Sequence, residues 1–336
     1  MMCMEPISIA SAITKYLDNI RHARSLHTAQ TYTNATNHFQ NVLRKNKLDP
    51  LTIPASNLTE DGMAWLLKYL KDFSPATEQL YLHAVKGFYE YLAAERLSDI
   101  NLPRLHLLIR QRARRPGIRL PQFPMESIED VLKFIAEPGS FLSMDGNERL
   151  RALRDRAFLL TLADTGLRVH EACKIRRGDI DWNEGRAIII GKGDKQAVIR
   201  FSSRSMNALK DYLSVRNELD GQSGKPLASL PLFARHDKGA GKRIKAMTTT
   251  SGRNIVKERV HEILGDEAKG KITPHSFRHY FVTSVLRGSG NLKLAQELAR
   301  HSNIQVTQRY AHLSNDELDK GYYDIFEKSK STIDLN

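Results

Sequence analysis

Apolar residues recur at helical spacing through the first hundred positions of the chain. In four segments they lie three or four positions apart, so that each segment would form a helix with one buried face. Ser74 followed by Pro75 is a cap and first-turn pair typical of a helix start. We therefore predict a helical domain over residues 1–96. Its apolar positions are Ile9, Ile13, Leu17 and Ile20; Tyr32, Ala35, Phe39, Val42 and Leu43; Leu58, Met63, Leu66, Leu67 and Leu70; and Tyr81, Val85, Phe88 and Leu92.

The periodicity stops over residues 97–124. Four prolines break helical spacing there, and arginines crowd the same interval. We interpret it as a basic linker between two domains. Its arginines could bind the phosphates of a duplex, or the segment could be a flexible tether in water, and the sequence leaves both open. The prolines are Pro103, Pro116, Pro121 and Pro124, and the arginines are Arg104, Arg110, Arg112, Arg114, Arg115 and Arg119.

A second domain is predicted over residues 125–336. Short strand-like runs separated by turns over residues 179–201 predict a small antiparallel sheet, with Lys192 on the tip of a glycine-flanked hairpin. Thr273 with Pro274 starts a further helix that Gly288 and Gly290 close. The fold class is thus mainly α with a small antiparallel β-sheet. The other predicted helices cover 125–136, about 149–164 (ended by Gly166), 203–219, around 255–264, a segment capped by Asn291, and 315–328.

The net charge of the chain limits the kinds of molecule that it could bind. The chain has 336 residues, enough for two domains, and a formal net charge of +13. This balance favours a polyanion, and nucleic acid over a membrane, since no apolar run approaches the ~20 residues that span a bilayer. The first residues lack the pattern of a secretory signal. Cys3 and Cys173 cannot form a disulfide framework or a thiolate zinc site, so we expect a reducing, cytoplasmic setting.

Two histidines, an arginine and a tyrosine gather near the end of the chain. His275 and Arg278 share one face of the predicted helix, and His301 and Tyr310 follow. Substitution at a phosphodiester places extra charge on the nonbridging oxygens, which arginine and imidazole donors can stabilise. A tyrosine can be the nucleophile that forms a covalent phosphoester. The residues therefore favour phosphoryl transfer on nucleic acid.

These residues resemble the tyrosine recombinase (phage integrase) family, whose second signature block has His-x-x-Arg, then Gly-His or similar, then Tyr. TGLRVHE, with Arg168 and Glu171, resembles the first arginine block of that family, and GKGDK resembles its lysine turn. In that turn Lys192 is the better match and Lys195 the second. Ser25-x-x-Thr28-x-x-x-Tyr32, followed by Phe39, looks like the family's N-terminal SAM-like core-binding domain, which would precede an α+β catalytic domain.

Two positions depart from the family pattern. His170 stands where serine is common, at a position that does not touch the phosphate in the family. Arg300 stands where the family usually has the glycine of Leu-Gly-His. If that glycine supplies a turn with positive φ, Arg300 implies a somewhat different backbone before His301.

The resemblance implies a mechanism and a set of partners. Tyr310 would attack the phosphate and form a 3′-phosphotyrosine, with Arg168, Arg278 and His301 stabilising the transition state. His275 would accept the tyrosine proton, Lys192 would protonate the leaving 5′ oxygen, and Glu171 would orient a neighbour. No metal, ATP or other cofactor is implied. The expected partners are double-stranded DNA at specific sites and, in the synaptic complex, a homotetramer, to which the last predicted helix could contribute unless it closes its own domain.

Two other functions stay open from the residues. A type IB topoisomerase-like enzyme would use the same chemistry as a monomer, and a catalytically silent DNA-binding regulator would use none of it. Exchange of flanking DNA between two duplexes distinguishes a recombinase from a topoisomerase-like enzyme. A covalent adduct between protein and DNA distinguishes either enzyme from a silent regulator.

Overall fold

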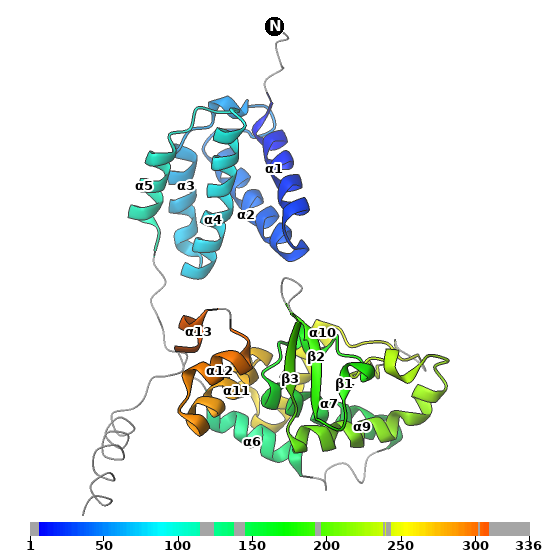
Figure 1. The fold of residues 1–336 in the computed structure, drawn as a ribbon. Coiled ribbons are helices and arrows are strands. Elements are labelled where there is room, and N and C mark those ends of the chain that lie inside the picture. The colour runs from blue at the N-terminus through cyan, green and yellow to red at the C-terminus, as the bar shows by residue number, and fades with distance from the viewer. Residues whose placement is uncertain are drawn as a thin grey trace, which may run out of the picture. The chain divides into compact units, whose positions relative to one another are not determined.

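The computed structural model describes residues 7–114, 124–137, 145–191, 196–237, 239, 243–301 and 303–308. The chain divides into two compact units, Met1–Arg119 and Leu120–Asn336, each with its own apolar core (Figure 1). The division falls within the interval that the sequence marks as a linker. Among the described residues, no helix is both long enough and apolar enough to cross a membrane.

The first unit is a helical bundle, as predicted. Its centre is aromatic: Phe39, Phe88 and Tyr89 are fully buried, and the Tyr16 hydroxyl donates to the Ala84 carbonyl 2.9 Å away. Ser74 caps its helix through the amide of Thr77, as expected from the Ser-Pro pair. The described helices are α1 (Ile9–Ala23), α2 (Leu26–Lys45), α3 (Asp61–Tyr69), α4 (Pro75–Ala94) and α5 (Leu102–Arg112), with short 3-10 turns at Ala55–Asn57 and Leu70–Asp72.

Helix α5 lies inside the segment interpreted as a linker. Asn101 caps it, and Pro103 occupies the first turn, where a missing amide hydrogen costs nothing. Leu105 is fully buried against the first unit, and Arg104 forms ion pairs with Glu60 and Asp61 at 3.1 and 3.3 Å. Part of the interval 97–124 is therefore a packed helix, and one of its arginines is already paired with carboxylates of the protein.

The second unit is also mostly helical. Helix α7 runs through its core and is buried along most of its length, and it packs against both α9 and α11 (Figure 1). The predicted helices between residues 125 and 299 are present. The described helices are α6 (Met125–Ala136), α7 (Gly146–Thr165), α8 (Val169–Ala172), α9 (Ser203–Gly221), α10 (Thr249–Leu264), α11 (Pro274–Ser289), α12 (Leu292–Ala299) and α13 (Ile304–Gln308), with 3-10 turns η4 (Arg177–Asp179), η5 (Leu227–Ser229) and η6 (Asp266–Ala268).

The predicted antiparallel sheet is confirmed. It has the order β1 (Ile180–Asp181), β2 (Arg186–Ile190) and β3 (Gln196–Arg200). Ala187 and Ile189 of β2 and Ile199 of β3 are buried between exposed neighbours, so one face packs on the core of the unit. The hairpin tip that connects β2 to β3, with Lys192 and Lys195, lies outside the described residues.

One helix end in the second unit differs from the sequence prediction. Gly166 ends α7 and Gly290 ends α11, both with φ near 60°, but Gly288 stays inside α11 instead of closing it. Helix α13 was not predicted from the sequence. The helix predicted at 315–328 lies outside the described residues.

Candidate active site

Arg168 is placed at the surface of the second unit by the turn between α7 and α8. Its amide and its Nη1 both donate to the carboxylate of Glu171, each at 2.9 Å. The Glu171 side chain is 3% exposed and that of Arg168 is 42% exposed. A buried carboxylate thus holds the guanidinium in place while leaving part of it open to a ligand. Glu171 thus contacts one of the neighbours that it was expected to orient.

Arg278, on α11, connects the ends of two other helices. Its Nη1 donates to the Gly166 carbonyl at the end of α7, and its Nη2 donates to the Ala299 carbonyl at the end of α12. A cation at the carbonyl end of a helix is favoured by the helix dipole. Arg278 is buried, so it fixes the segments that carry Arg168 and His301.

Arg300 occupies the position of the expected glycine. It has φ 57° and ψ 45°, which is the left-handed conformation that a glycine would adopt without strain. The expectation that an arginine here changes the backbone is therefore wrong, since Arg300 itself makes the turn. Its Nη2 reaches Glu171 at 3.1 Å and the Gly166 carbonyl at 3.5 Å.

The surroundings of the site's histidines favour the neutral form of each ring. Desolvation, and then the positive charges of Arg278 and Arg168, lower the pKa of His275. The same causes lower the pKa of His301 to about 4. His275 also contacts the ring of His279 edge to face, with 4.3 Å between ring centres. A neutral imidazole can accept a proton, as the role expected for His275 requires.

His301 has a fixed partner for one ring nitrogen. Its Nδ1 lies 2.8 Å from the hydroxyl of Thr307, which is fully buried on α13. When the hydroxyl donates to Nδ1, the proton of the neutral ring is on Nε2. Nε2 is then a hydrogen-bond donor, as the role expected for His301 requires.

The structure brings together four of the six predicted catalytic residues. Arg168, His275, Arg278 and His301 are close enough to perturb one another electrostatically. Lys192 and Tyr310 lie outside the described residues, and Tyr310 follows the last residue of α13 by two positions. The net positive charge of this cluster suits a phosphate group.

Sequence reasoning missed two residues of this cluster. The signal for Arg300 was present, since a charged residue stood at a helix end where the family has glycine. Thr307 gave no signal, because its role depends on how α13 folds back toward His301. No group of three or more His, Cys, Asp and Glu side chains in the described part of the chain could hold a metal ion.

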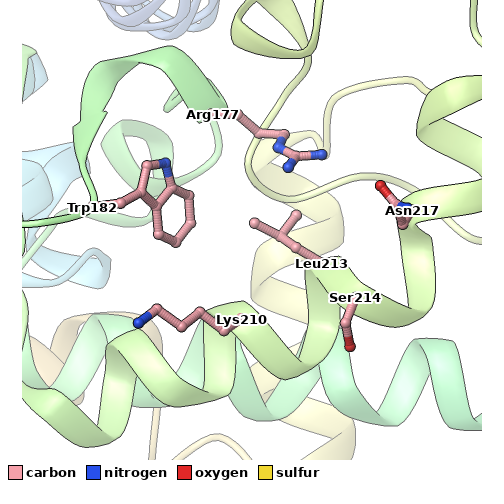
Figure 2. A pocket seen from close by; sticks show the side chains of 6 residues that line it. All are labelled: Arg177, Trp182, Lys210, Leu213, Ser214 and Asn217. Carbon is pink, nitrogen blue, oxygen red and sulfur yellow. The ribbon is translucent and has the colours of Figure 1, made fainter.

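A separate pocket of about 450 Å³ lies between the η4–β1 segment and α9 (Figure 2). Trp182 and Lys210 point toward the same space in Figure 2, while Arg177 is paired with Asp220 at 2.5 Å. It is lined by none of the predicted site residues, so the candidate chemistry lies elsewhere. The lining residues are Arg177, Trp182, Lys210, Leu213, Ser214 and Asn217.

Both units match known families. Residues 139–317 match the phage integrase family, and residues 13–96 match the phage integrase N-terminal SAM-like domain. Tyrosine recombinase XerC of Thermodesulfovibrio yellowstonii is 28% identical over 322 residues, covering 94% of this chain and 95% of the relative. Tyrosine recombinase XerC of Pelobacter propionicus is 31% identical over 250 residues, covering 74% of this chain and 73% of the relative.

Solved structures share the fold. The XerH site-specific recombinase in a post-cleavage complex with a palindromic difH substrate has a TM-score of 0.65 at 22% identity, covering 93% of this chain and 83% of that one. A lambda integrase dimer bound to a COC′ core site has a TM-score of 0.62 at 16% identity, covering 91% and 96%. The mostly helical architecture with a small sheet is therefore one that DNA-bound recombinases adopt.

Proposed function

Because this chain belongs to the phage integrase family and is a site-specific recombinase that cleaves and rejoins DNA, we propose that it does so through a phosphotyrosine at Tyr310. The observation that supports this most strongly is the cluster of Arg168, His275, Arg278 and His301 beside the segment that leads to Tyr310. All four side chains have chemistry suited to a phosphodiester, and two are histidines kept neutral.

In the proposed cleavage step, the Tyr310 oxygen attacks the phosphorus and its proton passes to His275. The bond from phosphorus to the 5′ oxygen breaks, and Lys192 gives that oxygen a proton. The products are a 3′-phosphotyrosine and a free 5′ hydroxyl. Rejoining is the reverse reaction with a 5′ hydroxyl as nucleophile, so the phosphodiester bond energy is kept and ATP is not needed.

The transition state of this step carries extra negative charge on the nonbridging oxygens. Arg168 is the exposed guanidinium of the cluster, held by Glu171, and it would donate to those oxygens. His301 would donate from Nε2. Arg278 would contribute mainly its charge and the placement of its neighbours, because it is buried and its terminal nitrogens each donate to a carbonyl group of the protein.

Double-stranded DNA at specific sites is the proposed substrate, and the net charge of +13 suits it. The structural relatives include recombinases bound to DNA. Exchange between two duplexes requires four strand cleavages, so we propose a homotetramer in the synaptic complex. Since the substrate is DNA, the proposed place of action is the cytoplasm.

The comparisons do not favour a topoisomerase-like enzyme or a silent DNA-binding regulator, because the relatives are recombinases. A duplex with a nick beside the scissile phosphate tests the proposal. The short cleaved fragment diffuses away, so the covalent adduct accumulates. The native chain should form this adduct, and Tyr310→Phe should bind the same DNA without forming it.

Two outcomes would contradict the proposal. An adduct formed by Tyr310→Phe would exclude this residue as the nucleophile. Adduct formation without any exchange of flanking DNA between two duplexes, across substrates that carry a complete site, would favour the topoisomerase.

A further inference from the structure

Two arginines share one buried carboxylate in the candidate active site. Glu171 accepts hydrogen bonds from Nη1 of Arg168 at 2.9 Å and from Nη2 of Arg300 at 3.1 Å. The Glu171 carboxylate also accepts a hydrogen bond from the amide of Arg168, at 2.9 Å. Since the carboxylate is 3% exposed, both of its charge partners are supplied by the protein.

Both the backbone and the side chain of Arg300 adopt arrangements that are unfavourable for an arginine. A non-glycine residue rarely adopts the left-handed conformation, and here the arginine has φ 57°. Its side chain is 13% exposed, and its Nε and Nη1 are buried without a hydrogen-bond partner in the described part of the chain. A glycine would remove both costs, but it would also remove the ion pair with Glu171 and the contact with the Gly166 carbonyl.

The charge of the site supplies a reason for an arginine at this position. Arg168 and Glu171 alone form a neutral pair, in which the carboxylate offsets the positive charge that faces the ligand. With Arg300 included, the three side chains carry a net charge of +1. The positive potential at Arg168 is thus stronger than in a site that has only the pair.

We propose that Arg300 is a positioning residue for DNA cleavage: it neutralises Glu171 from the protein side and so preserves the charge and orientation of Arg168 for the scissile phosphate. This inference rests on the proposed function. Arg300 is also the first charged group that lowers the pKa of Glu171 against the opposing effect of burial, which agrees with this arrangement.

The test combines Arg300→Gly with Glu171→Gln and measures the single-turnover rate of adduct formation on the nicked duplex. In the native background, Arg300→Gly should lower the rate by about 10- to 100-fold, with DNA affinity unchanged within about 2-fold. In the Glu171→Gln background, where no carboxylate charge remains to be neutralised, the same substitution should lower the rate by less than about 3-fold. Arg300→Lys should keep part of the native rate.

Arg96→Gly is a matched control. Arg96 is also an arginine with positive φ, 54°, but it is exposed and lies in the first unit. Its replacement removes the same charge and the same backbone strain, and it should leave the cleavage rate at saturating DNA unchanged. Thermal melting should show Arg300→Gly at least as stable as the native chain, because glycine suits this backbone.

Each contrary result has its own meaning. An equal loss of rate from Arg300→Gly in both backgrounds, or no loss in either, would overturn this inference alone. A loss that follows a lowered melting temperature and is not restored in part by lysine would show a merely structural role. Absence of any adduct with the native chain would contradict the proposed function, and this inference with it.

Discussion

At the scale of single residues, the site depends on hydrogen bonds that hold the reactive side chains in place and favour one protonated form of each. His301 is the clearest case, since its Nδ1 lies 2.8 Å from the Thr307 hydroxyl, and a hydroxyl that donates to Nδ1 leaves the ring proton on Nε2. Thr307 is fully buried, so its hydroxyl is shielded from water. The proposed hydrogen bond from His301 Nε2 to a phosphate oxygen therefore depends on Thr307, which is buried beside the ring.

Thr307→Val tests this dependence. The substitution removes the hydroxyl with little change of shape, so the His301 ring loses its hydrogen-bond partner at Nδ1. We expect the rate of adduct formation to fall by about 10-fold, with DNA affinity nearly unchanged. Thr307→Ser, which keeps the hydroxyl, should retain most of the rate. Equal rates for the valine and serine variants would contradict the role assigned to Thr307.

At the scale of secondary-structure elements, one helix end organises the cluster. The Gly166 carbonyl, at the end of α7, accepts from Arg278 on α11 and from Arg300 after α12. Gly166 has φ 60°, and a Cβ added there would overlap the ring of Phe281. The turn that precedes Arg168 therefore strongly favours glycine.

Gly166→Ala should destabilise the second unit by roughly 2 to 5 kcal/mol, the combined cost of a left-handed alanine and of overpacking against Phe281. Denaturant unfolding measures this change. Gly146→Ala, in the first turn of the same helix with nothing within 4 Å of the added methyl, is the control and should change stability by less than about 1 kcal/mol. A similar small effect at Gly166 would contradict the crowding at this helix end.

The β2–β3 hairpin carries the proposed general acid. Lys192→Ala should slow cleavage of an ordinary substrate strongly, because the 5′ oxygen then leaves without a proton. A substrate with a 5′ sulfur at the scissile position should be cleaved at nearly the native rate, since a thiolate needs no proton to leave. Lys195→Ala is the control on the same hairpin. Failure of the sulfur substrate to restore the rate would assign the acid to Lys195 or to another group.

At the scale of the whole molecule, several histidines are kept neutral by the fold. Burial is the first cause in each case, and it lowers the pKa of His236 to about 3 and those of His279 and His301 to about 4. In the unfolded chain these groups titrate near the ordinary value of about 6.5. Between these pKa values the unfolded state binds more protons than the folded state, so folding stability decreases as pH falls.

The melting temperature should therefore decline as pH is lowered from about 7 to about 5, which calorimetry can measure. This window lies above the range in which the carboxylates Glu78 and Glu171 lose their own contribution, because the pKa of each is lowered from its ordinary value. His236→Gln should make the decline shallower. A melting temperature that is constant over this window would contradict the assignment of buried neutral histidines.

The sequence alone predicted the helices of both units and the small sheet, because these features depend on local periodicity and spacing. It missed α5, since Pro103 was interpreted as a break although proline is tolerated in a first turn. It also misjudged the backbone at Arg300, where Glu171 and the Gly166 carbonyl bind the side chain. Contacts between residues distant in the sequence decide such positions, and spacing does not contain them.

The most direct test of the account is to locate the covalent bond. After reaction with the nicked duplex, digestion with nuclease and trypsin should release the peptide that runs from Tyr310 to Lys320, cleaved after Arg309. Mass spectrometry should find a nucleotide 3′-phosphate on Tyr310 and on no other residue. Cleaved DNA with an unmodified Tyr310, or with the nucleotide on a different side chain, would contradict the proposed mechanism.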